Sequence, residues 1–135
     1  MHPPAVSLGY VILYVPDVAA SLAFYEEAFG LQRRFFNDDH GKAYGELETG
    51  AARLAFASFE LIREHAGPDT AASLGKGNFG GEVALVTPEV GALYARAVNA
   101  GGTPVRGPAV KPWGQTVAYL RDNAGHLVEL CTPLP

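Results

Sequence analysis

The chain has 135 residues, 48% of them hydrophobic, with ten Lys and Arg against fourteen Asp and Glu for a net charge of −4. This length suits one compact core and excludes a second independent domain, and the absence of a basic run argues against nucleic acid as a partner. Every apolar run is too short to span a membrane, and the single Cys131 excludes an internal disulfide. With no signal-peptide pattern at the start, we expect a cytoplasmic protein.

The first half of the chain begins with a β-branched and aromatic run at residues 10–15, which is typical of a buried strand. Asp17 suits the N-cap of a helix, and apolar residues at helical spacing continue the helix to a stop at Gly30. Turn-rich segments then separate three short strands, which precede a short helix and a linker that runs to residue 80. These elements are expected at residues 31–36, 43–48, 53–58 and 59–65.

The second half repeats this order. Residues 82–86 form the expected strand, Thr87 is the expected N-cap, and Pro88 takes the first helical position. The helix runs to Ala100 and stops at the glycines that follow it. The three final strands are expected near residues 104–106, 116–120 and 126–131.

Residues 10–31 and 82–103 are two copies of one pattern, displaced by 72 positions. Eight residues are identical between the copies, namely Val11, Leu13, Pro16, Val18, Ala20, Ala23, Ala28 and Gly30 in the first. Each copy predicts a strand, a helix and three further strands, so the chain is a duplicated half-fold. We predict an α+β domain over residues 1–135, with one βαβββ module at about 8–58, a linker at 59–80 and a second module at about 81–133.

Three segments carry a resemblance to a known family, namely VILYVPDVAASLAFYEEAFGL, GEVALVTPEV and PWGQTVAYLRDNAGHLVEL. The chain resembles the vicinal-oxygen-chelate superfamily of glyoxalases, bleomycin-resistance proteins and extradiol dioxygenases from about Tyr10 to Pro133. The resemblance implies a curved, cup-like mixed sheet with the helices outside, closed either within one chain or across a dimer. A homodimer is expected, because pairing also covers open edge strands.

The resemblance also implies four metal-ligand positions, which are Tyr10, Ala55, Glu82 and Glu129 in this chain. Tyr10 and Ala55 leave two of the four without a usual ligand. Catalytic zinc, nickel and iron sites generally have three protein ligands, usually including imidazole. We therefore expect no metal cofactor, and the alternative is a divalent ion held weakly between the two glutamates.

The four histidines do not complete such a site in the sequence pattern. His126 precedes Glu129 by an odd number of residues on one strand, so the two side chains should point to opposite faces. His40 lies in a turn, His65 at the linker and His2 near the terminus. We expect all four to be solvated surface residues.

Glu82 and Glu129 are expected to face one apolar hollow, where two bare carboxylates need compensation. The candidates are a cation, a shared proton, the Tyr10 hydroxyl, the Arg53 guanidinium, or a cationic or hydroxyl-bearing ligand, and we favour Arg53. The structural alternative is that either glutamate is paired at the rim. Strand alternation puts Tyr14 on the same face, where it offers an aromatic wall. Trp113 lies in a loop and is expected to contact the ligand from there.

Two functions fit these residues. The favoured one is a metal-free protein that binds a small organic ligand in an acidic, aromatic-walled cup, with Tyr10, Tyr14, Arg53 and Trp113 as ligand-binding residues. The alternative is a glyoxalase-like lyase or isomerase in which Glu82 and Glu129 are metal ligands or an acid/base pair.

Overall fold

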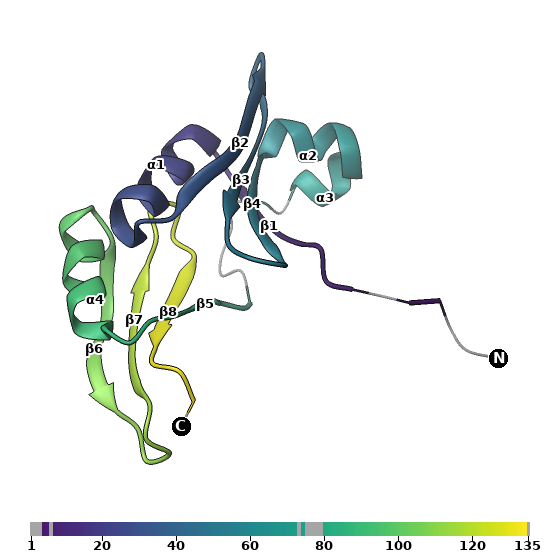
Figure 1. Ribbon diagram of the computed structural model, residues 1–135. Coiled ribbons are helices and arrows are strands. Elements are labelled where there is room, and N and C mark those ends of the chain that lie inside the picture. The colour runs from purple at the N-terminus through teal and green to yellow at the C-terminus, as the bar shows by residue number, and fades with distance from the viewer. Residues whose placement is uncertain (1–3, 6, 73, 75–79, 135) are drawn as a thin grey trace.

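The structure, a computed structural model, describes residues 4–5, 7–72, 74 and 80–134. Two four-stranded mixed sheets make up the fold, each with one long helix packed on one side (Figure 1). His2 and residues 73 and 75–79 of the expected linker lie outside the described part of the chain.

The elements follow the same order twice, which confirms the predicted tandem βαβββ architecture. The first half contains β1 (Tyr10–Val15), α1 (Val18–Phe29), β2 (Gln32–Asp39), β3 (Lys42–Glu48) and β4 (Arg53–Ser58). Two short helices follow, α2 (Phe59–Ala66) and α3 (Pro68–Ala72). The second half contains β5 (Val83–Val86), α4 (Val90–Asn99), β6 (Thr103–Val110), β7 (Thr116–Arg121) and β8 (Leu127–Cys131). The strand orders are β1-β4-β3-β2 and β5-β8-β7-β6.

The register of the two sheets confirms the repeat residue by residue. β1 runs parallel to β4 with Ile12 opposite Ala55, and β5 runs parallel to β8 with Ala84 opposite Glu129. Since Ile12 and Ala84 are equivalent in the repeat, Ala55 and Glu129 occupy equivalent places in the two sheets.

Local capping explains the bounds of α1. The Asp17 side chain accepts a hydrogen bond from the Ala20 amide at 3.0 Å, which satisfies a free donor of the first turn. Gly30 ends the helix with φ of 70°, a left-handed conformation that favours glycine. The predicted helix is therefore confirmed at both ends.

The start of α4 differs from the prediction. The helix begins at Val90 with Glu89 as its N-cap residue, so Pro88 precedes the helix and Thr87 does not cap it. The Thr87 amide donates to the Cys131 carbonyl at 2.9 Å and extends the β5–β8 ladder by one residue. Thr87 is thus held in extended backbone, and its hydroxyl accepts from the Glu89 amide in the turn before the helix.

Several strands are longer than the sequence predicted, β2 and β6 most of all. β2 and β3 extend to a two-residue turn at His40 and Gly41, whose φ values of 53° and 91° suit a tight hairpin. β6 covers eight residues and is irregular in two places against β7. The additional helix α3 lies where only a linker was expected.

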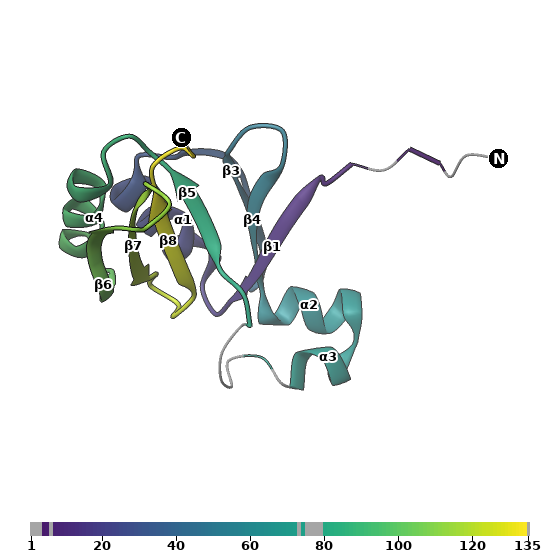
Figure 2. The ribbon, with the colours of Figure 1, turned by 90° about the horizontal axis from the view of Figure 1, so that it is seen from below.

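The two halves contact each other through α1 and α4, and their helix-facing sides share one hydrophobic core. That core includes Leu13, Leu22, Tyr25, Phe56, Ala97, Leu120, Val128 and Leu130. Among the described residues the two sheets stay separate and are not closed into one barrel; α2 and α3 lie beside β1 and β4 (Figure 2). We call the side of each sheet that faces away from α1 or α4 its open face.

No helix in the described part of the chain is both long enough and apolar enough to cross a membrane.

Candidate functional site

The open face of the first sheet carries the residues that strand alternation predicted. Tyr10, Ile12 and Tyr14 of β1 lie opposite Arg53, Ala55 and Ala57 of β4. β3 adds Tyr44 opposite Ala57 and Glu46 opposite Ala55. Ala55 and Ala57 are buried although they face this side.

A cavity of about 380 Å³ lies between this face and helix α2. The sheet contributes Ile12, Tyr14, Asn37, Lys42, Tyr44 and Ala57, and the helix contributes Leu61, Ile62 and His65. A cavity of this size with apolar and aromatic walls and a few polar groups is typical of a small-molecule site.

The polar groups of the cavity are held by neighbours outside it. The Lys42 ammonium donates to Glu64 Oε1 at 3.1 Å, and His65 Nε2 lies 3.9 Å from Glu64 Oε2. The Tyr44 hydroxyl donates to Glu46 Oε2 at 2.7 Å. Burial and the Glu46 carboxylate raise the pKa of Tyr44, so its hydroxyl stays protonated. No carboxylate is among the described residues that line this cavity.

Sequence reasoning missed six of these lining residues, namely Asn37, Lys42, Tyr44, Leu61, Ile62 and His65. The register of β3 against β4 gives Tyr44, and the one-turn spacing of Leu61 and His65 puts both on one face of α2. His65 was expected as a solvated histidine; its side chain is 63% exposed, yet it lines the cavity. The placement of α2 over the sheet is a tertiary feature that no local pattern announces.

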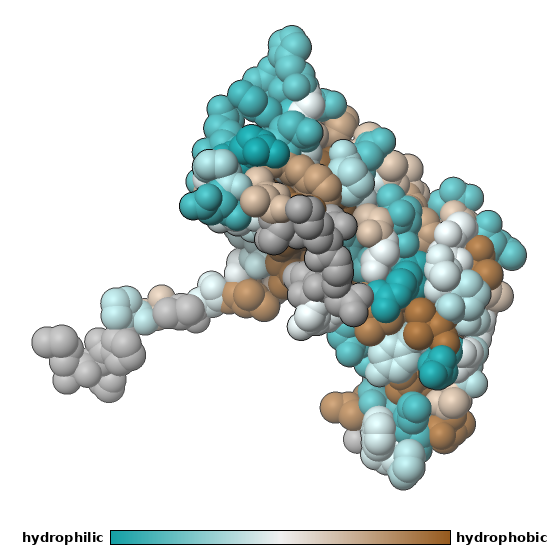
Figure 3. Space-filling view, turned by 180° about the vertical axis from the view of Figure 1, so that it is seen from behind, coloured by the Kyte–Doolittle hydropathy of each residue, from teal (hydrophilic) through white to brown (hydrophobic). Residues whose placement is uncertain are grey.

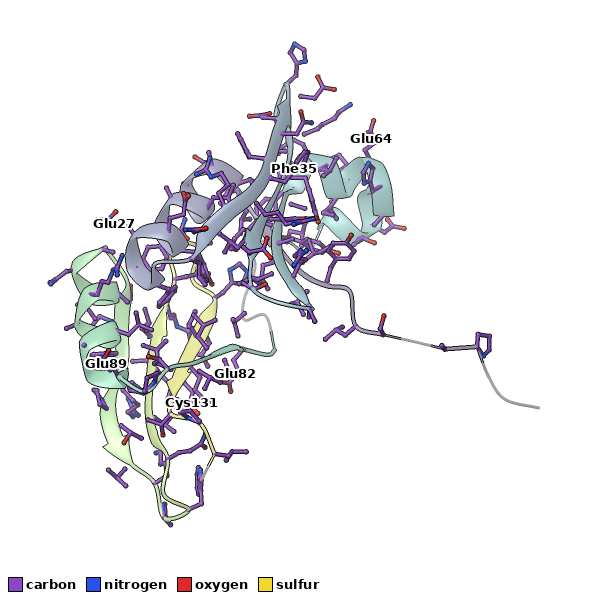
Figure 4. The ribbon with its side chains drawn as sticks, in the orientation of Figure 1. Glu27, Phe35, Glu64, Glu82, Glu89 and Cys131 are labelled. Atoms are coloured by element: carbon purple, nitrogen blue, oxygen red, sulfur yellow. The ribbon has the colours of Figure 1, made fainter. Side chains whose placement is uncertain are left out.

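The open face of the second sheet carries the acidic residues. Glu82 and Glu129 lie close enough to interact: partial burial, a hydrogen bond with Glu129 and the charge of Glu129 raise the pKa of Glu82. The Tyr119 hydroxyl donates to Glu129 Oε1 at 3.0 Å, and this bond raises the pKa of Tyr119 to about 12. Burial and Glu129 also raise the pKa of the Cys131 thiol. Figure 4 shows Glu82 and Cys131 on this half, with Phe35 and Glu64 on the other.

The predicted partner of the glutamates is wrong within one chain. Arg53 donates to Glu48 Oε1 at 3.0 Å and to the Gly50 carbonyl at 2.6 Å, both in the first half. Tyr10 also lies on the first sheet, where it is 56% exposed. Glu129 instead accepts a hydrogen bond from the Tyr119 hydroxyl, because Tyr119 lies directly opposite Glu129 on the neighbouring strand.

Trp113 lies in the β6–β7 turn of the second half and is 58% exposed. Its indole donates to Gln115 Oε1 at 2.8 Å, and Gln115 donates in turn to the Thr132 carbonyl. The ring is therefore fixed, but it does not lie on the sheet that carries Tyr10, Tyr14 and Arg53. Other large apolar side chains are also exposed, and apolar patches alternate with polar surface on the face seen from behind (Figure 3).

His126 is not the solvated residue that was expected. Its side chain is only 14% exposed, and its Nδ1 lies 3.4 Å from the buried Asp122 carboxylate. The same carboxylate accepts a hydrogen bond of 2.8 Å from the Tyr25 hydroxyl of α1. Burial alone raises the pKa of Asp122, but the hydrogen bonds from His126 and Tyr25 outweigh burial and hold it below its usual value. These residues join the two halves on the side away from the open faces.

The donor set does not fit a catalytic metal. Of the four positions that the resemblance implied, two are glutamates, one is a tyrosine and one is an alanine. No group of three or more His, Cys, Asp or Glu side chains in the described part of the chain is arranged to hold a metal ion. Two carboxylates without imidazole fall short of the three ligands that zinc or iron enzymes use.

The model of the glyoxalase/bleomycin resistance protein/dioxygenase superfamily matches residues 7–130 of this chain. A glyoxalase-related enzyme from Fulvimarina pelagi shares 25% identity, with 94% of this chain and 88% of that chain covered and a TM-score of 0.80. A family member from Burkholderia phytofirmans PsJN shares 21% identity, with 94% and 98% covered and a TM-score of 0.80. A third, from Nocardioides, shares 22% identity, with 98% and 87% covered and a TM-score of 0.70. No curated protein matches the chain.

Proposed function

Since the chain belongs to the glyoxalase/bleomycin resistance protein/dioxygenase superfamily, we propose that it binds a small organic molecule without a metal cofactor. The observation that carries this proposal is the cavity of about 380 Å³ between α2 and the first sheet. Its size lies in the range of small-molecule sites, and its walls are mostly apolar and aromatic.

The chemistry of the open faces supports binding over metal-dependent catalysis. Ala55 has no donor atom, and Glu46 opposite it is engaged by the Tyr44 hydroxyl and lies 3.4 Å from Arg34 Nε. The aromatic cavity and the acidic pair belong to different sheets, so the acidic, aromatic-walled cup expected from the sequence is divided between the two halves. The ligand-binding role proposed here for Tyr14 belongs to the cavity, whereas Tyr10 and Arg53 lie elsewhere on the same sheet and Trp113 lies in the second half.

Metal analysis tests the metal-free part of the proposal. Protein dialysed against divalent ions and then passed through a desalting column should carry no stoichiometric metal by elemental analysis. Native mass spectrometry of the protein as purified should instead show an organic adduct that denaturation releases. One firmly held ion per chain contradicts the metal-free part of the proposal, whether or not an organic adduct is present.

A second candidate function rests on the carboxyl pair of the second sheet. The raised pKa of Glu82 beside Glu129 is the kind of difference that lets one carboxyl act as an acid and the other as a base. In this alternative the protein is a lyase or isomerase of glyoxalase type. Glu129→Gln should then abolish turnover of a hydroxyacyl or epoxide-like substrate while the melting temperature stays near that of the wild type, and unchanged turnover rules the alternative out.

We also propose that the protein works as a homodimer. β1 and β5 are edge strands of their sheets and carry exposed apolar residues, with Tyr10 56% and Val86 65% exposed. A second copy that pairs with these edges would cover them and close each open face. Sedimentation at micromolar concentration should give the mass of two chains, and a single monomeric species contradicts this assembly.

A further inference from the structure

Helix α2 is an addition to the duplicated half-fold. The first half continues from β4 directly into α2, whereas the described chain after β8 consists of three residues without a helix. The Ser58 hydroxyl fixes the start of α2 by accepting from the Leu61 amide at 3.2 Å and also accepts from the Ala43 amide of β3. The helix is therefore anchored to the sheet at Ser58, next to the cavity residue Ala57.

The cavity beneath α2 is suited to a flat apolar ring. Ile12 and Ala57 of the sheet and Leu61 and Ile62 of the helix line a space that no side chain of the described residues fills. Ile62 is only 8% exposed, so the helix already packs its apolar face here. The rings of Tyr14 and Tyr44 supply the flat surfaces against which an aromatic ligand packs well.

The charged groups of the cavity have one sign. Among the described residues that line it, Lys42 is the only Lys, Arg, Asp or Glu, and Asn37 and His65 add further hydrogen-bond donors. The Lys42 ammonium has three donors, of which Glu64 accepts one, so it retains donors for a ligand anion. The acidic pair Glu82 and Glu129 lies on the other sheet of the same chain, and the carboxylate that contacts Lys42 is that of Glu64 on α2.

We propose, on the basis of the binding function above, that this cavity takes a planar apolar ring compound that bears a carboxylate. The ring lies against Tyr14 and Tyr44 under α2, and the carboxylate meets Lys42 at the mouth. This identifies the ligand as an anion, opposite to the cationic ligand that an acidic cup selects.

The test uses 2-naphthoate and its uncharged isostere 2-naphthamide, titrated into the purified full chain by isothermal calorimetry. The anion should bind roughly ten-fold more tightly than the amide, because the charge-assisted bond to Lys42 is lost in the amide. Lys42→Gln should remove this preference. Arg33→Gln makes the same change in net charge at a surface pair with Glu26 and should leave the preference intact.

Glu64 provides a variant of opposite sign. Glu64→Gln removes the carboxylate that Lys42 now contacts, so binding of 2-naphthoate should tighten by roughly three-fold. An amide that binds as well as the anion, equal losses in the Lys42 and Arg33 variants, or no binding of either compound each overturns the inference. The binding function itself falls only if the protein as purified also lacks an organic adduct, which is a separate measurement.

Discussion

The first sheet presents three tyrosines, two buried alanines and the cavity beneath α2 on its open face, whereas the second presents Glu82, Glu129 and Tyr119. Both sheets have the same strand order, and their helix-facing sides enter one core. The register determines where a side chain points but not which side chain stands there. In a duplicated fold, function must therefore be argued separately for each open face.

The largest expected effect comes from breaking the link between the halves. Asp122→Ala leaves the buried Tyr25 hydroxyl without its acceptor and frees the Ala124 and His126 amides of the β7–β8 turn. We expect the free energy of unfolding to fall by about 3 kcal/mol, measured by urea denaturation. Asp39→Ala, on an exposed hairpin, is the control and should change it by less than about 0.5 kcal/mol.

A smaller loss should follow from crowding the helix side of the first sheet. A Cβ added at Gly45 would lie 2.6 Å from Leu22 Cδ1 of α1, so Gly45→Ala should cost about 2 kcal/mol through displaced packing. Gly107→Ala is matched to it, because a Cβ at Gly107 meets no atom within 4 Å and that glycine has no positive φ. Equal melting temperatures for the two variants contradict this account of how α1 sits on β3.

The same link between the halves predicts an acid sensitivity. Because the folded pKa of Asp122 is held below 3.8, its stabilising effect is complete above that value and is lost as the pH falls through the folded pKa. The stability difference between wild type and Asp122→Asn should therefore stay constant above about pH 5 and shrink as the pH falls below 3.8. Urea titrations at several pH values measure it, and a difference that stays constant below 3.8 as well contradicts the assignment.

The smallest effect concerns the acidic pair. The raised pKa of Glu82 means that its protonated form stabilises the fold below 4.5 and that this contribution is lost as the pH rises through the folded pKa. In the wild type this loss should lower the melting temperature as the pH rises from 4.5 through the folded pKa of Glu82. Glu82→Gln should make that decrease smaller. Glu89→Gln, at the start of α4, is the control and should leave the slope as it is.

Much of the fold could be predicted because its signals are local. β1 and α1 have the bounds that alternation, helical spacing, Asp17 and Gly30 predicted, and the 72-residue displacement gave the second half. The start of α4 was placed too early because the Thr87 backbone belongs to the sheet. His126 was wrongly assigned to the surface because its burial depends on a distant contact. It lies beside Asp122, which accepts a hydrogen bond from Tyr25, 97 residues earlier in the chain.

The candidate site was predicted in part for the same reason. Strand parity put Tyr14 on the open face and brought Glu82 together with Glu129. Parity says nothing of how a helix such as α2 folds over a sheet, so Lys42 and His65 were missed as cavity residues. It also gave no means of deciding that the aromatic and acidic groups belong to separate sheets.

The ligand is proposed to lie under α2 and not at the acidic pair. A crystal structure of the protein soaked with 2-naphthoate decides between these two places. We predict electron density for the ring against Tyr14 and Tyr44, with the carboxylate within hydrogen-bond distance of the Lys42 ammonium. Density beside Glu82 and Glu129, with the cavity under α2 left to water, would contradict the account.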